Sequence, residues 1–318
     1  MSEHNIRVGV VGVGHLGRYH VQKYVDMPGV DLVGVVDLNR EQARKVAEQH
    51  GTRVFEEPAA LYDQVDAVSV VVPTVDHYAV ASQALEAGRD VLLEKPITAV
   101  IEEAEKLVAL ASAGNRILQV GHLERFNPVF TAALKFINQP RFLEVHRLSS
   151  FTFRSVDVDV ILDLMIHDLD LILCLVNSPV TEIFAVGVPV LSDQVDIANV
   201  RVHFANGAVC NLTASRVSAQ RERKIRIFQP NIYLSMDLGN FSLVQCEKKE
   251  MDYYSPIPNI KVQKHEFPEA DSLNLELTSF IRCVRERTRP EVSGEDGLAA
   301  LKVATRIKEI MEKQQLLS

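Results

Sequence analysis

The sequence predicts an α/β protein of two domains, and three observations support this. Residues 6–11 have the pattern of a buried strand, and three closely spaced glycines and then a helical pattern follow them. Short apolar runs and helical patterns alternate up to about residue 120, which indicates a parallel sheet with helices on both faces. Between residues 141 and 247 strand patterns follow one another directly, which favours a large, mainly antiparallel open sheet. A chain of 318 residues is long enough for two such cores.

The glycine turn predicts a dinucleotide site. Gly12-x-Gly14-x-x-Gly17 lies between a strand and a helix, the context that the dinucleotide-binding fingerprint requires. Gly12 makes the tight turn, Gly14 lets the backbone approach a pyrophosphate, and Gly17 lets the helix lie close to the strand. The free N–H groups at the helix start face the anion. We therefore assign residues 1–123 to a Rossmann domain and residues 124–318 to a substrate-binding and oligomerisation domain, whose last helices could pack back on the first.

The second strand, residues 31–37, ends on Asp37, twenty residues after Gly17. A carboxylate at this position would accept hydrogen bonds from the adenosine ribose. The alternative is that Asp37 only caps the helix that starts near Arg40. A carboxylate here would repel the 2′-phosphate of NADP, so the predicted cofactor is NAD. Arg40 is close enough to reduce this preference for NAD over NADP.

The remaining elements follow from apolar periodicity and from stop signals such as Gly51 and Gly88. In the first domain we predict, in order, a helix at 41–50, a strand at 53–55, a helix at 58–62, a strand at 67–72, a helix at 76–87, a strand at 90–93, a helix at 99–113 and a strand at 117–120. In the second we predict a helix up to residue 136, a strand at 141–153, a helix at 160–176, strands at 181–189, 197–204, 208–214, 223–228, 232–237 and 241–247, and helices at 273–286 and 295–315. Asn206-Gly207 predicts a hairpin turn.

Two polar clusters stand at the carboxyl ends of predicted parallel strands, where ligands of open α/β sheets bind. Pro73 and Thr74, with His77, follow the fourth strand, and Thr74 could equally be a helix cap. Glu94-Lys95-Pro96 follows the fifth. A cationic neighbour such as a nicotinamide ring would lower the pKa of Lys95 and make it a usable proton donor, although a lone Lys-Pro here is more often a solvated loop.

A third cluster lies on the predicted helix at 160–176. Asp163 and His167 are four residues apart and so share one helix face. A carboxylate beside an imidazole orients it and raises its pKa, a common acid–base arrangement. The alternatives are a helix with satisfied polar residues, or a two-ligand metal site, for which no third ligand has suitable spacing. We predict no metal.

Composition excludes several classes of protein. The net charge of −8 argues against a general nucleic-acid binder. The basic cluster at 221–226 indicates a solvated strand side, or else a contact with an anionic ligand or another subunit. We expect no membrane partner and a cytoplasmic location, because no apolar run spans a bilayer and no signal peptide is recognised. The four cysteines are widely spaced, which indicates reduced core residues.

Five motifs in this order resemble the Gfo/Idh/MocA oxidoreductase family over essentially the whole chain. They are the fingerprint, Pro-Thr-x-x-His at 73–77, Glu-Lys-Pro at 94–96, Gly-His-Leu-Glu-Arg-Phe-Asn-Pro at 121–128, and Asp-x-x-x-His-Asp at 163–168. The resemblance implies hydride transfer between a sugar or cyclitol carbinol and NAD(P), with Lys95, Asp163 and His167 as catalytic residues. It also implies a dimer or tetramer formed through the exposed sheet face. The cofactor residues we expect are Gly12, Val13, Gly14, His15, Leu16, Gly17, Asp37, Pro73, Thr74, His77, Glu94 and Lys95.

Within the family, the segments at 125–128 and 157–168 look like the branch that oxidises UDP-N-acetylglucosamine at C3, a step toward the 2,3-diamino sugars of lipid A. Many members carry Gly-Gly before the catalytic helix, whereas residues 158–160 here read Val-Asp-Val, so this part of the pocket differs from the free-sugar enzymes. A nucleotide sugar brings a diphosphate, and arginines suit it. The expected substrate residues are Lys95, Arg125, Asn127, Arg154, Asp163, His167 and Arg216.

Three alternatives remain open at this stage. The chain could be a dehydrogenase of another sugar, of a cyclitol or of a UDP-sugar uronate. It could be an NAD-binding sensor without activity, against which the intact Lys95, Asp163 and His167 argue. It could also be an imine or biliverdin-type reductase, which would use the reduced cofactor. Absorbance of NADH with a panel of sugars discriminates between them.

Overall fold

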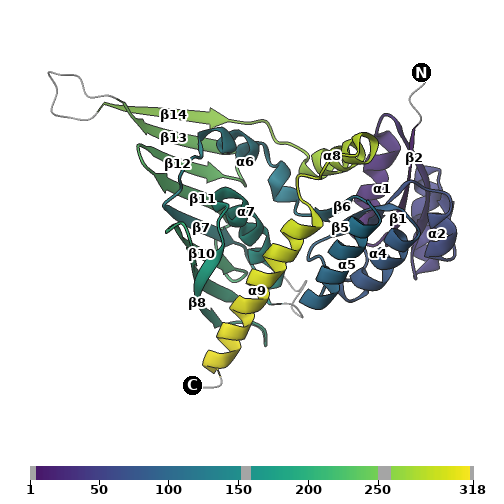
Figure 1. Cartoon of the computed structure of the whole chain (residues 1–318), viewed down its shortest axis with the longest axis horizontal. Helices are drawn as coiled ribbons and strands as arrows, with labels where there is room; N and C mark the ends of the chain where they lie inside the picture. Colours follow the sequence, from purple (N-terminus) through teal and green to yellow (C-terminus); the bar gives the residue numbers. More distant parts are fainter. Residues whose placement is uncertain (1–4, 152–158, 250–258, 316–318) are drawn as a thin grey trace. The chain divides into compact units, whose positions relative to one another are not determined.

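The computed structural model describes residues 5–151, 159–249 and 259–315 (Figure 1). The chain forms two compact units, each made of two stretches of sequence. Unit 1 contains Met1–Leu123 and Asp271–Leu301, and unit 2 contains Glu124–Ala270 and Lys302–Ser318. The α/β class is confirmed, with one parallel and one mainly antiparallel sheet.

Unit 1 is built on a six-stranded parallel sheet in the order β3-β2-β1-β4-β5-β6. Its strands are β1 (Ile6–Val11), β2 (Val30–Val36), β3 (Arg53–Val54), β4 (Ala67–Val70), β5 (Asp90–Glu94) and β6 (Leu118–Gly121). The strand order reverses between β1 and β4. In doubly wound sheets a dinucleotide binds beyond the strand ends at this switch point.

The helices of unit 1 are α1 (Gly17–Asp26), α2 (Arg40–His50), α3 (Pro58–Tyr62), α4 (His77–Glu86), α5 (Ile101–Ala113) and α8 (Ser272–Glu286). Asn39 caps α2 by accepting the N–H of Gln42, and Gly51 ends it with φ +65°. Tyr24 of α1 and Phe280 of α8 belong to one buried apolar cluster, so α8 completes the core of this unit although it comes from the far end of the sequence.

Unit 2 is built on an eight-stranded sheet in the order β14-β13-β12-β11-β7-β10-β9-β8. Its strands are β7 (Phe142–Leu148), β8 (Val180–Val188), β9 (Ile197–Phe204), β10 (Val209–Ser215), β11 (Glu222–Gln229), β12 (Ile232–Asp237), β13 (Ser242–Lys248) and β14 (Ile260–Glu266). Only β7 and β10 pair in parallel among these strands. The hairpin between β9 and β10 turns at Gly207, φ +82°, as the sequence predicts.

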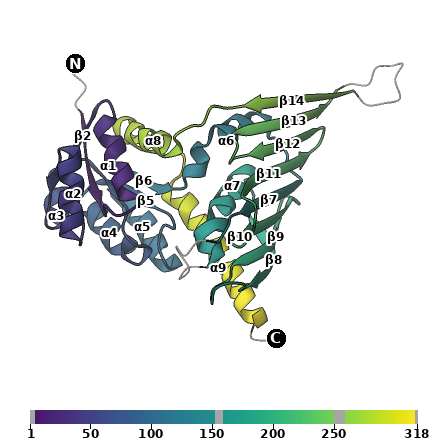
Figure 2. The same cartoon turned by 180° about the vertical axis from the view of Figure 1, so that it is seen from behind.

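One face of this sheet carries the core of unit 2. The helices α6 (Pro128–Ala133) and α7 (Ile166–Val176) lie on that face, and no helix of unit 2 is drawn on the other face in Figures 1 and 2. Residues of α9 (Gly294–Gln315) from Val303 onward join the same buried apolar cluster. Side chains therefore alternate between this core and the uncovered face along each strand.

Three elements differ from the sequence-based expectation. The strand predicted at 141–153 ends at Leu148, where polar Ser149 turns its N–H to Ser215; residues 152–153 lie outside the described part. The edge strand β14 was not predicted, because its exposed sequence is mostly charged or polar and its only apolar residues are Ile260 and Val262. The helix predicted at 160–176 begins as a π-helical segment, Ile161–Met165, before α7.

Candidate active site

The glycine turn of unit 1 has the geometry of a cradle for a phosphate. Gly12 has φ +87°, and a Cβ there would lie 2.4 Å from the carbonyl oxygen of Val71. A Cβ on Gly17 would lie 1.9 Å from the carbonyl oxygen of Gly12, so only glycine permits this approach of helix and strand. By contrast a Cβ on Gly14 would meet no atom within 4 Å. This open space beside exposed backbone at the start of α1 fits a pyrophosphate.

The side chain of Asp37 is hydrogen-bonded to this turn. Its Oδ2 accepts the N–H of Val13 at 2.7 Å, and its Oδ1 accepts the N–H of Asn39 at 2.8 Å. The carboxylate is half-buried at the end of β2 and does not cap α2, since Asn39 does. The alternative of a mere helix cap is therefore wrong. The position of Asp37 beside the glycine turn is the one expected for a residue that binds the adenosine ribose.

Replacing Asp37 by Asn is expected to narrow the preference for NAD over NADP by about tenfold or more, because it removes the charge that repels a 2′-phosphate. The amide oxygen can still accept the N–H of Val13, so the turn stays anchored. Asp37→Ala removes that anchor as well and should weaken both cofactors. The measurement is calorimetric titration with each cofactor; equal affinities in the unmodified protein would contradict the assignment.

His77 joins two strand ends of unit 1. It is 1 % exposed, and its ring nitrogens lie 2.8 Å from the carbonyl oxygen of Pro96 and 3.0 Å from that of Val72. Burial lowers the pKa of His77 more than these carbonyl groups raise it. It follows that His77 fixes the loop after β4, with Pro73 and Thr74, against the loop after β5. Cofactor contact by these three residues stays a prediction.

Lys95 directly follows Glu94, whose buried carboxylate pairs with the imidazole of His20. The carboxylate of Glu94 accepts the backbone N–H of Lys95 at 3.2 Å and lies 3.2 Å from Nε2 of His20. Burial raises the pKa of Glu94, but its contacts with His20 and Lys95 outweigh this and lower it. Lys95 is half-buried, and its peptide bond to Pro96 is cis. Sequence reasoning missed His20, whose only signal was a polar residue on the inward face of the helix after the glycine turn.

Asp163 and His167 lie in unit 2 on the π-helical segment and on the first turn of α7. Both side chains are half-buried, whereas the two aspartates that follow are buried. Asp168 and Asp170 therefore point into the protein while Asp163 and His167 keep contact with solvent. π-helical turns are rare and occur frequently at functional sites. This arrangement supports an acid–base role for Asp163 and His167.

The buried face of α7 is held by two bidentate ion pairs. Arg147 donates to both carboxylate oxygens of Asp168 at 2.8 Å and to Glu124 at 3.0 Å. Arg125 donates to both oxygens of Asp170, at 2.6 and 2.9 Å. Burial opposes the charge of Arg147, but Asp168 and Glu124 outweigh it and raise the pKa of Arg147. Burial also raises the pKa of Asp168, although Arg147 acts to lower it. These pairs fix the orientation of α7 and thus of His167.

Three of the predicted substrate residues form hydrogen bonds with other residues of unit 2. Arg125 pairs with Asp170, Arg216 donates from Nε to Asp196 at 2.7 Å, and Asn127 caps α6 by accepting the N–H of Val129. All three are at most 9 % exposed. Arg154 lies outside the described residues. Contact of these side chains with a diphosphate stays a prediction, and each has a structural role besides.

Three further observations concern metal sites, cysteines and membrane spans. Over residues 5–151, 159–249 and 259–315, no cluster of three or more Cys, His, Asp or Glu side chains could hold a metal ion. In the same ranges all four cysteines are free thiols. The helices described there include none long and apolar enough to cross a membrane. Hydride transfer to a nicotinamide requires neither a bound metal ion nor a disulfide.

Fold and site together define an NAD-binding oxidoreductase of two domains. Comparison with known proteins identifies the family within this class. Residues 6–122 match the model of the oxidoreductase family with an NAD-binding Rossmann fold, and residues 137–232 match the model of the GFO/IDH/MocA C-terminal domain. The chain belongs to the Gfo/Idh/MocA family, as the motifs indicated.

Several relatives match along nearly the whole chain. The UDP-N-acetylglucosamine 3-dehydrogenase of Acidithiobacillus ferrooxidans is 38 % identical over 97 % of this chain and 98 % of the relative, and a solved structure of it superposes with a TM-score of 0.92, covering 97 % and 98 %. The scyllo-inositol 2-dehydrogenase (NAD(+)) of Bacillus subtilis is 27 % identical over 95 % of this chain and 92 % of its own. The scyllo-inositol dehydrogenase of Lactobacillus casei with bound NAD(H) and scyllo-inositol, 20 % identical, shares the fold with a TM-score of 0.82 over 98 % of both chains.

Proposed function

We propose that this enzyme oxidises the C3 hydroxyl of UDP-N-acetylglucosamine to a ketone with NAD. The observation that carries this proposal is the 38 % identity to a UDP-N-acetylglucosamine 3-dehydrogenase over 97 % of the chain, against 27 % for the inositol enzyme. The half-buried Asp163 and His167, the open glycine turn and the position of Lys95 after β5 support it.

Each candidate residue has a defined role in this reaction. When bound, NAD supplies the hydride acceptor at C4 of its nicotinamide. His167 takes the proton of the sugar hydroxyl, and Lys95 holds that oxygen and stabilises its developing negative charge. Asp163 orients the sugar and the imidazole. One proton and one hydride leave the carbinol, so the ketone, NADH and a protonated base balance the reaction. The alternative, with Lys95 as the base, uses the same groups.

The experiment that tests the substrate offers UDP-N-acetylglucosamine, free N-acetylglucosamine and myo-inositol, each with NAD, and follows NADH by absorbance. An amine that traps the 3-keto product draws the unfavourable equilibrium forward. NADH formation with the UDP-linked sugar alone supports the proposal. Comparable rates with the free sugar or with myo-inositol would refute it and return the enzyme to the wider sugar and cyclitol dehydrogenases. Binding of NAD without turnover on any of them would indicate a sensor.

The proposed product also implies a place in metabolism. A 3-keto sugar nucleotide is a substrate for an aminotransferase, and the resulting 2,3-diamino sugar suits lipid A. Nucleotide sugars and NAD are both intracellular metabolites, so we propose that the enzyme acts in the cytoplasm.

We also propose that two copies associate through the uncovered face of the sheet of unit 2. Six apolar side chains stand in register across this face, each opposite the next; they are Val209, Phe142, Phe228, Tyr233, Cys246 and Val262. The rings of Phe142 and Phe228 lie 5.6 Å apart, and those of Phe228 and Tyr233 5.0 Å apart. A continuous apolar row of this kind typically marks an interface.

Phe228→Glu is therefore expected to convert a dimer or tetramer into a smaller species, because it places a charge in the middle of this row. Light scattering at micromolar concentration measures the mass. Lys45→Glu, at an exposed site on α2 of unit 1, serves as the control and should leave the mass unchanged. A monomeric unmodified protein would contradict the proposal.

A further inference from the structure

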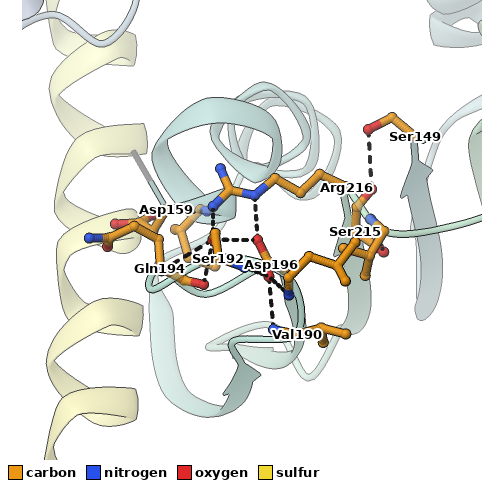
Figure 3. A network of polar contacts seen from close by, with 11 residues as sticks. Ser149, Asp159, Val190, Ser192, Gln194, Asp196, Ser215 and Arg216 are labelled. Carbon is orange, nitrogen blue, oxygen red and sulfur yellow. Dashed lines mark hydrogen bonds and ion pairs between the residues drawn. The ribbon is translucent and has the colours of Figure 1, made fainter. Parts of the chain in front are cut away.

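A single buried carboxylate organises the loop between β8 and β9. Oδ2 of Asp196 accepts the backbone N–H groups of Val190, Leu191 and Ser192 at 2.8, 2.6 and 2.9 Å, and Oδ1 accepts the hydroxyl of Ser192 at 2.7 Å (Figure 3). Asp196 has no exposed surface. Loops seldom wrap around a buried charge unless that charge is fully satisfied, and here it is.

Arg216, directly after β10, closes the loop from the neighbouring strand. Its Nε donates to Oδ1 of Asp196 at 2.7 Å, one terminal nitrogen donates to Oγ of Ser192 at 2.9 Å, and its backbone N–H donates to the carbonyl of Asp196 at 3.0 Å. Burial opposes the charge of Asp196, but the N–H of Leu191 and the guanidinium outweigh this and hold the pKa of Asp196 well below its usual range. Buried ion pairs contribute little net stability compared with apolar packing, so stability alone does not account for this cluster.

The loop touches the start of the segment that carries Asp163 and His167. The carbonyl of Val195 accepts the N–H of Val160 at 3.1 Å. Asp159 then accepts the N–H groups of Ile161 and Leu162 on its side chain, both at 3.0 Å. The first N–H groups of any helix lack partners within it, and whatever accepts them fixes where the helix begins.

This support matters because the segment begins as a π-helix. Its turn, Ile161–Met165, is wider than an α-helical turn, so the point at which it changes to α7 sets the direction of Asp163 relative to His167. The backbone N–H of Asp163 itself donates to the carbonyl of Asp159 at 3.1 Å. A shift of Val160 would therefore pass directly to Asp163.

We propose that Asp196, Arg216 and Ser192 are positioning residues, which hold Val195 against Val160 and so fix the direction of Asp163 and His167. The proposal rests on the catalytic roles given above to Asp163 and His167. It assigns to Arg216 a task inside the protein in place of a contact with the substrate diphosphate.

The first test needs neither cofactor nor substrate. Hydrogen exchange is measured on the whole protein and on Asp196→Asn, with Ser192→Ala as a milder variant that keeps the ion pair. Amides 160–166 are expected to exchange at least about tenfold faster in both variants. The control is Asp237→Asn, since Asp237 holds another turn of the same sheet by accepting two hydrogen bonds from Asn240. It should leave amides 160–166 unchanged. Faster exchange confined to residues 189–196 would overturn the proposal.

The second test is kinetic and uses the sugar that gives turnover. Both variants are expected to lower kcat by about tenfold or more and to shift the pH profile of kcat/KM, because His167 is displaced, while the affinity for NAD stays unchanged. An increase of KM for the sugar nucleotide in Arg216→Gln, with kcat retained, would overturn the proposal in favour of a diphosphate contact. If the substrate assignment is wrong, the exchange result still decides the positioning role.

Discussion

Replacing Lys95 or His167 by Ala is expected to lower turnover by roughly 10²–10⁴-fold, the scale on which general acid–base catalysis is lost. Lys95 follows β5 in unit 1, where Glu94 and the loop held by His77 fix its backbone. His167 lies in the first turn of α7 in unit 2, where the ion pairs of Asp168 and Asp170 hold the helix. Buried polar contacts thus hold the backbone at both residues. Steady-state rates on the preferred sugar measure the loss.

Two controls make this expectation specific. The affinity for NAD should be unchanged in His167→Ala, because unit 2 contributes none of the predicted cofactor residues. Lys106→Ala on the exposed side of α5 should retain full turnover. Near-normal turnover of His167→Ala on the true substrate would contradict the role assigned to this imidazole.

Arg147→Ala is expected to reduce the free energy of unfolding by about 3–5 kcal/mol, the usual effect of removing one partner from a buried ion pair. Arg147 is 4 % exposed, and without it the carboxylates of Asp168 and Glu124 stay buried with their main counter-charge removed. Urea unfolding followed by circular dichroism measures the change.

The matched control is Arg226→Ala in the neighbouring strand. Arg226 pairs with Glu144 at 2.9 Å, but about a third of each side chain is exposed, so water screens the pair. Exposed pairs of this kind contribute about 1 kcal/mol or less. Equal destabilisation by the two substitutions would show that the cluster around Arg147 does not hold α7 in place.

The sequence could predict the parts of this protein that local chemistry determines. The glycine turn and Asp37 sit at fixed spacing within one βα unit, and alternation with helices predicts the parallel sheet. The hairpin at Gly207 follows from its own dipeptide. Each of these features has a recurring sequence pattern or motif spacing, so each is visible in one sequence.

Features that depend on distant partners could not be predicted. Asp168 looked like part of a motif, yet its partner Arg147 lies 21 residues earlier, and Arg125 and Asp170 are 45 residues apart. His20 meets Glu94 across 74 residues. The π-helical start of α7 depends on Val195 and Asp159, which periodicity within the helix does not reveal. Long-range packing decides these points.

The measurement that tests the central claim most directly uses UDP-N-acetylglucosamine labelled with deuterium at C3. If the enzyme removes hydride from this carbon, the deuterium appears at C4 of the nicotinamide, and the formation of reduced cofactor is slowed by a primary isotope effect when hydride transfer limits the rate. The same sugar labelled at C4 should give unlabelled NADH at the normal rate. Reduced cofactor that carries no deuterium from C3 would contradict the account.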